Sequence, residues 1–176
     1  MEPNGLHVAL MDVIPFLKWL ESSSLSVSIR ETLWGYPIIE TVHVLGLCLF
    51  LGFTLMLDLR LLGVALKGTR ASEVCRRLEP WMVAGFVIMT ISGVLLFYGD
   101  PVKFYGSIFM RIKFFMLIAA GLNVLVFKTG SYRKVKDWDL FPKTPVGAKI
   151  AASVSLTMWV GIVAMGRAIA YFLPPG

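Results

Sequence analysis

Apolar and polar positions divide the chain into four long apolar runs separated by short polar segments. A helix crosses the ~30 Å hydrocarbon core of a bilayer with about 20 residues, because it rises about 1.5 Å per residue. We therefore predict four membrane-spanning helices, the second starting just after Pro80, at about residues 34–57, 81–98, 108–127 and 146–172. The predicted fold class is all-α, an integral membrane four-helix bundle that occupies residues 33–173.

The third run carries two charges near its start. Its uncharged part, residues 114–127, is about 9 Å shorter than the hydrocarbon core, so the helix must begin before Arg111. Lys113 shares a helical face with Met116 and Asn123, whereas Arg111 points almost opposite. We therefore expect Lys113 to turn into the bundle and Arg111 to reach the outer headgroups.

The segment before the first run, residues 1–32, has a different pattern. Apolar and charged residues alternate between Asp12 and Glu21, and a serine cluster follows. This pattern predicts an amphipathic helix within residues 8–31 that lies on the outer membrane surface. The alternative is a mobile tail. The segment has neither the basic start nor the cleavage site of a signal peptide, so we expect the chain to be mature.

Composition and charge support a membrane protein. Hydrophobic residues make up 57% of the 176 residues and charged residues 16%, against roughly 25% charged in a soluble domain. The net charge of +6 is concentrated in residues 59–80 and 128–149, whereas Lys103 is the only basic residue between the second and third runs. The positive-inside rule then places both basic segments in the cytoplasm and both termini on the periplasmic side of a bacterial inner membrane. The expected partner is the lipid bilayer and not a nucleic acid.

Ionisable side chains inside the predicted spans suggest a functional site. Each costs about 2.5–3.5 kcal/mol at the centre of a membrane helix, so each is a functional hypothesis. Glu40, His43, Thr54 and Asp58 fall on one face of the first helix. The alternative explanation is a seam between helices in which these groups are hydrogen-bonded.

The depth of His43 suggests a haem. His43, Gly93 and two methionines lie about 8–14 Å below the outer helix ends, with three cations above them. A b-type haem needs a neutral imidazole for its iron, glycine for close approach of the porphyrin, and cations for its propionates. The predicted haem b site has His43 as the metal ligand and, around it, Gly46, Gly93, Lys113, Arg111, Arg167, Met116 and Met165. Because the second histidine, His7, precedes the spans, the sixth ligand would be Met116, Met165, Lys113, water or a group from another subunit.

A motif in the first span adds a resemblance. The run Trp34-x-Tyr36-Pro37-x-x-Glu40-x-x-His43-x-x-Gly46, with Gly52 and then Asp58-Leu59-Arg60-Leu61-Leu62-Gly63, resembles an uncharacterised family of small bacterial membrane proteins. This resemblance covers about residues 24–167. More distantly, the layout is similar to HemJ-type haem-dependent protoporphyrinogen oxidases and to copper-resistance D-type membrane proteins. The shared features would be His43, Arg77 ahead of Gly85 and Gly93, and Lys113. This second resemblance implies a haem at His43.

Two function classes follow from these observations. The first is a b-haem protein that moves electrons between the quinone pool and an outer-side partner such as a cytochrome, with Glu40 holding the imidazole or accepting a proton. The alternative is a non-redox membrane subunit or transporter in which Glu40, His43 and Lys113 form a proton or ion relay. A redox enzyme acting on an apolar substrate such as a porphyrin is a third reading, without assigned catalytic residues. A homo-oligomer or a larger membrane complex is compatible with each.

Overall fold

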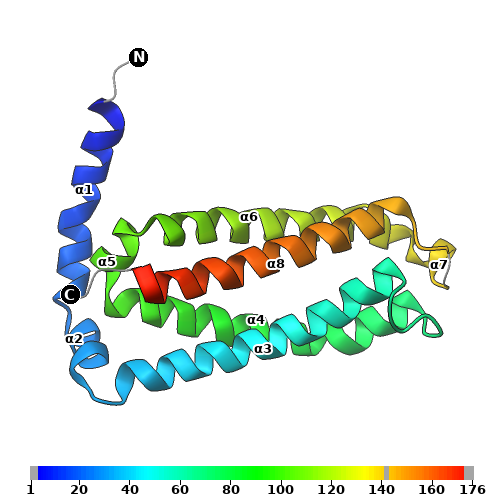
Figure 1. The fold of residues 1–176 in the computed structure, drawn as a ribbon, viewed down its shortest axis with the longest axis horizontal. Helices are drawn as coiled ribbons and strands as arrows, with labels where there is room; N and C mark the ends of the chain where they lie inside the picture. The colour runs from blue at the N-terminus through cyan, green and yellow to red at the C-terminus, as the bar shows by residue number, and fades with distance from the viewer. Residues whose placement is uncertain (1–3, 141–142, 173–176) are drawn as a thin grey trace.

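Four long helices form an elongated bundle (Figure 1). The computed structural model describes residues 4–140 and 143–172, with side chains from Val13 onward. Residue 173, the predicted end of the bundle domain, and the side chain of His7 lie outside this description. Among the described residues, four helices are long and apolar enough to cross a membrane: α3 (Gly35–Leu62), α4 (Ala71–Gly99), α6 (Ile108–Thr129) and α8 (Val146–Phe172). The prediction of four apolar helices is confirmed, and α8 has the predicted limits.

The limits of α3 and α4 differ from the prediction at their shared end. α3 continues beyond residue 57 to Leu62 and ends at Gly63, whose φ of 74° is the left-handed conformation common after a helix. α4 begins at residue 71 instead of 81, with Pro80 inside it. The prediction of a boundary at Pro80 was wrong because a proline removes one helical hydrogen bond without preventing the helix from continuing. The early start is capped by Asp139, whose carboxylate accepts hydrogen bonds from the Ser72 N–H (2.7 Å) and hydroxyl (2.8 Å).

A buried arginine ties the chain together at this same end. Arg60 is fully buried, and its guanidinium donates to the carbonyls of Thr69 (2.7 Å) and Asp139 (3.1 Å). Apolar side chains of α3, α4 and the short helices η1 (Ser131–Lys134) and α7 (Val135–Trp138) pack beside it. Arg60 therefore has a structural role, although its position in a basic segment suggested a charge at the membrane surface.

At the opposite end, two helices replace the single amphipathic helix that was predicted. They are α1 (Asn4–Glu21), which lies crosswise to the long helices at the end of the bundle and projects past them (Figure 1), and α2 (Ser24–Glu31). The serine cluster causes the break. The Ser22 and Ser23 hydroxyls donate to the carbonyls of Trp19 (2.8 Å) and Leu20 (2.6 Å), and Ser23 then accepts from the Ser26 N–H.

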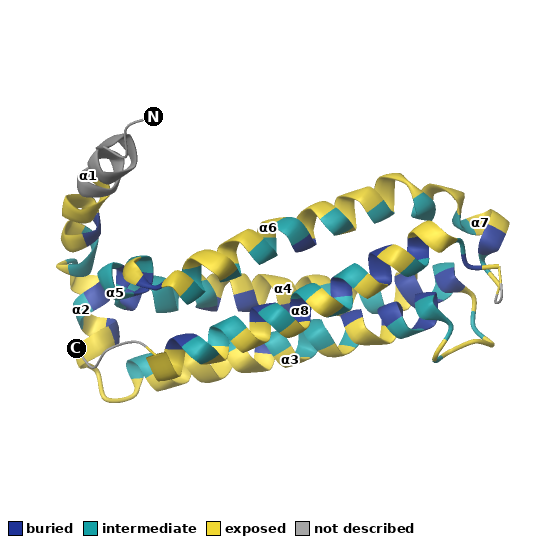
Figure 2. Cartoon of the chain, turned by 45° about the horizontal axis from the view of Figure 1, so that its top comes forward, coloured by how far each residue is buried: buried dark blue, intermediate teal, exposed yellow. Residues whose placement is uncertain are grey.

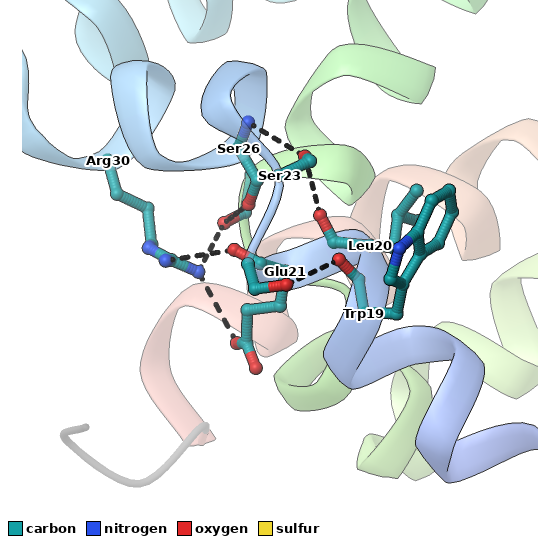
Figure 3. A network of polar contacts seen from close by, with 8 residues as sticks. Trp19, Leu20, Glu21, Ser23, Ser26 and Arg30 are labelled. Carbon is teal, nitrogen blue, oxygen red and sulfur yellow. Dashed lines mark hydrogen bonds and ion pairs between the residues drawn. The ribbon is translucent and has the colours of Figure 1, made fainter.

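Polar contacts attach this N-terminal segment to the end of α4 (Figure 3). The Ser26 hydroxyl and the Arg30 guanidinium both donate to the Gly99 carbonyl, at 3.2 and 3.3 Å. Arg30 also forms an ion pair with Glu21 at 3.4 Å, which joins α1 to α2. Helix α5 (Pro101–Gly106) follows at the same end and packs against α1. The segment is therefore helical and held in place, and its contact with a membrane surface stays a prediction.

The bundle consists of two helix pairs. α3 packs along α4, α6 packs along α8, and a smaller contact between α3 and α8 joins the pairs. The α3–α4 contact is close enough to bring backbones together: a Cβ added to Gly85 would lie 2.6 Å from the Phe50 nitrogen. Exposed residues cover the outward faces of the helices (Figure 2), and many are large apolar side chains, which suits a lipid environment.

Candidate functional site

The imidazole of His43 is held by α4. Its Nδ1 lies 3.1 Å from the Ser92 hydroxyl oxygen. The Ser92 hydroxyl donates its hydrogen to the Ile88 carbonyl at 2.6 Å, so it accepts from the Nδ1–H of His43. We assign the tautomer on this basis, and it leaves Nε2 with a free lone pair.

Gly93 provides the space for this imidazole. A Cβ at position 93 would lie 3.1 Å from His43 Cε1 and 3.4 Å from Nδ1. The imidazole therefore packs directly on the backbone of α4, in the space that a larger residue would fill. The sequence predicted His43 and Gly93 at one depth, and the structure brings them into contact.

Lys113 approaches the same region from the other helix pair. Its side chain is half-buried, and its Nζ lies 3.6 Å from the position of a Cβ on Gly166 of α8. Lys113 is near enough to His43 for their charges to interact, but among the described residues it forms no hydrogen bond and no ion pair. We call the cluster His43, Ser92, Gly93, Lys113 and Gly166 the outer polar site. All four long helices contribute to it.

The two predicted arginines lie on the surface of the bundle. Arg111 is exposed, with its guanidinium over the Tyr105 ring and donating to the Tyr105 carbonyl at 3.4 Å. Arg167 is also exposed. Its guanidinium lies over the Tyr171 ring and donates to the Tyr171 hydroxyl oxygen at 2.9 Å. Within the described residues, no hydrogen bond joins either arginine to His43 or Lys113.

The remaining predicted residues lie around the outer polar site without joining it. The side chain of Met116 occupies the space that a Cβ on Gly161 would fill, and Met165 is half-buried. Gly46 belongs to the α3–α4 crossing, where its Cβ would lie 2.8 Å from Ile88 Cγ2. Glu40 is exposed, and within the described residues no hydrogen bond joins it to His43.

A second polar cluster lies toward the opposite end of the bundle. Thr54 and Asp58 of α3 are both buried, and so is Ser155 of α8, whose hydroxyl lies near enough to the Asp58 carboxylate to interact with it. Close by on α8, the Ala151 carbonyl accepts from the amide of Asn123 at 2.9 Å. We call Thr54, Asp58 and Ser155 the inner oxygen site.

An apolar layer separates the two clusters. The rings of Phe50 and Trp159 meet edge to face with centroids 4.7 Å apart, and Met89 and Ile162 pack around them. Thr54 is eleven positions after His43 on α3, which corresponds to about 16 Å of helix. The polar groups therefore form two separate sites and not one continuous line across the bundle.

The residues present fit one part of a haem site. His43, with Nδ1 engaged and Nε2 free, has the arrangement of an axial ligand. The glycines assigned to the porphyrin instead have other parts of the chain against them: Gly93 packs against the imidazole of His43, and Gly46 packs against Ile88. The geometry thus offers an iron ligand but does not fit a porphyrin at these glycines. Haem b, with quinone or an outer-side cytochrome as partner, stays a prediction of the sequence.

Two roles were not found from the sequence. Ser92 as the partner of His43 and Ser155 as the partner of Asp58 both depend on the rotation and register of neighbouring helices. Gly166, beside Lys113, likewise gave no signal in its own helix. Small residues on a membrane helix mark close packing in general, and they do not show which side chain will fill the space.

The comparisons with known proteins reach the level of a family. Residues 16–172 match the profile of a family whose description is a family of unknown function. No curated protein matches the chain, and no protein of known structure does either. The resemblance to an uncharacterised family is therefore confirmed, whereas the more distant resemblance to HemJ-type oxidases and copper-resistance D-type proteins finds no support in these comparisons.

Proposed function

The chain belongs to this family of unknown function, DUF6644, so we propose its function from the residues of the outer polar site. We propose that the protein is a non-redox membrane transport protein, or the membrane subunit of one, and that it binds a small anion at Lys113. The observation that supports it is the half-buried ammonium of Lys113, which has no counter-ion among the described residues. A cation inside a membrane span is costly unless an opposite charge accompanies it. A bound anion would supply that charge.

His43 adds a proton acceptor to this site. With Nδ1–H donated to Ser92, the free Nε2 can accept a hydrogen bond or a proton from the ligand. A cation beside a proton acceptor suits the carboxylate of a weak organic acid or an inorganic oxyanion. Of the three residues in the relay that the sequence suggested, the proposal retains His43 and Lys113. It leaves out Glu40, which is exposed.

We further propose the orientation that the charges favour. The loop between α3 and α4 and the segment between α6 and α8 lie at one end of the bundle, whereas α1, α2 and α5 lie at the other (Figure 1). The first end carries the two basic segments, so we place it in the cytoplasm of a bacterial cell. With this orientation the outer polar site lies in the periplasmic half of the inner membrane.

Anion binding can be tested by thermal stability in detergent. Acetate, succinate, inorganic phosphate and chloride are added as choline salts, which keeps sodium out of the measurement. An anion at 100 times its dissociation constant stabilises a protein by about 2.7 kcal/mol, which is about 5–10 °C for a chain of this size. We expect at least one anion to raise the melting temperature of the wild type, and Lys113→Met to abolish that shift.

Arg111 provides the matched control. It lies two residues before Lys113 on α6 but is exposed and paired with Tyr105, so Arg111→Met should respond to the anion as the wild type does. The proposal is refuted if no anion shifts the wild type, or if the shift survives in Lys113→Met. If a reduced-minus-oxidised absorption spectrum of the purified protein showed stoichiometric haem, electron transfer would replace anion transport as the proposed function.

A further inference from the structure

The inner oxygen site gathers three buried oxygen-bearing side chains. Thr54, Asp58 and Ser155 are only 7%, 5% and 8% exposed. Thr54 and Asp58 are four positions apart on α3 and so share one face of it, and Ser155 reaches Asp58 from α8. The site therefore lies in the contact that joins the two helix pairs.

Two oxygens of this site lack partners. Asp58 Oδ2 and Thr54 Oγ1 are fully buried, and neither has a hydrogen-bond partner among the described residues. No basic side chain of residues 13–140 or 143–172 forms an ion pair with Asp58. Arg60, two positions further on, donates instead to the Thr69 and Asp139 carbonyls. A buried carboxylate with an unpaired oxygen calls for a cation or a proton.

We propose that the inner oxygen site binds a sodium ion. Carboxylate and hydroxyl oxygens are ligands that hard cations prefer. A single carboxylate balances a single positive charge, whereas a divalent ion would leave an unbalanced charge in an apolar bundle. A proton on Asp58 would satisfy the carboxyl group alone. A sodium ion would instead take both the Asp58 carboxylate and Thr54 Oγ1 as ligands.

This sodium site is distinct from the proposed anion site. Asp58 is fifteen positions after His43 on α3, about 22 Å along the helix, and the Phe50–Trp159 layer lies between them. The inference goes beyond the proposed function, because sodium binding depends on Thr54, Asp58 and Ser155 alone. Either proposal can fail while the other holds.

Carbodiimide labelling tests the proposal on the full chain. Dicyclohexylcarbodiimide enters membranes and adds to protonated carboxyl groups, which ends in a stable N-acylurea that peptide mass spectrometry locates. A bound sodium ion competes with protonation of Asp58 and should slow its labelling at least fivefold in sodium chloride, compared with choline chloride at the same pH and ionic strength. Glu40 is exposed and serves as the internal control, since its labelling should be equal in both salts.

A conservative variant separates a sodium site from a buried carboxyl group alone. Thr54→Val keeps the shape of the side chain and the Asp58 carboxylate but removes one proposed ligand, so the sodium concentration for half protection should rise about tenfold. Thr157→Val should leave that concentration unchanged, because Thr157 is exposed and bonded to Ser153 of its own helix. Equal labelling of Asp58 in both salts, or unchanged protection in Thr54→Val, would overturn the proposal.

Discussion

Replacing Gly85 with alanine tests the helix crossing that positions His43. A Cβ at this position would lie 2.6 Å from the Phe50 nitrogen, 2.9 Å from the Phe50 Cα and 3.0 Å from the Gly46 carbonyl oxygen. All three are backbone atoms, so no side chain can rotate away. The first of these distances must lengthen to the 3.4 Å of an ordinary contact, and this requires α3 and α4 to separate. Overpacking of this kind costs about 1–3 kcal/mol.

Gly52→Ala is the matched control for this variant. Gly52 is exposed on α3, and a Cβ there would meet nothing within 4 Å. Both substitutions gain about 1 kcal/mol of helix propensity, so this gain cancels between them. Gly85→Ala should therefore be less stable than Gly52→Ala by about 1–3 kcal/mol in unfolding of the detergent-solubilised proteins. Equal stability of the two variants would show that the α3–α4 contact is looser than the structure has it.

Two further predictions concern topology and the inner end of the bundle. Reporter fusions after Lys67 and after Lys136 should be cytoplasmic and one at the C-terminus periplasmic, because both basic segments lie at one end; a cytoplasmic C-terminus would reverse the orientation. Asp139→Ala should lower the free energy of unfolding by about 0.5–2 kcal/mol, since it removes the acceptor for the Ser72 N–H and hydroxyl. The exposed Asp137→Ala should have no such effect, and a similar loss of stability in both variants would argue against the cap.

The apolar runs determined most of the fold. A helix in a membrane satisfies its own backbone, so run length alone predicted α6 and α8 to within two residues. The errors arose where the chain leaves the membrane. Hydropathy could not show that α4 starts before Pro80, because that start depends on Asp139, 67 positions after its partner Ser72. The break between α1 and α2 was readable in principle, since serines compete for backbone hydrogen bonds.

The site was less predictable than the fold. Helical periodicity grouped His43 with Asp58 on one face of α3, and both turn toward other helices in the structure. The same periodicity added Glu40, which is exposed. Periodicity gives the direction of a side chain but not the register of the neighbouring helix. The sequence therefore assigned the space beside Gly93 to a porphyrin, whereas the structure fills it with the imidazole of His43.

Both polar sites are divided between the two helix pairs, so a movement of one pair against the other would affect both of them. In the outer polar site, His43 and Ser92 belong to the α3–α4 pair, whereas Lys113 and Gly166 belong to the α6–α8 pair. In the inner oxygen site, Asp58 lies on α3 and its partner Ser155 on α8. Contacts within each pair are more extensive than those between the pairs, so a movement of one pair against the other disrupts the least packing. Such a movement would change the Lys113–His43 separation and the Asp58–Ser155 contact together, and it would also separate the Phe50 ring of α3 from the Trp159 ring of α8.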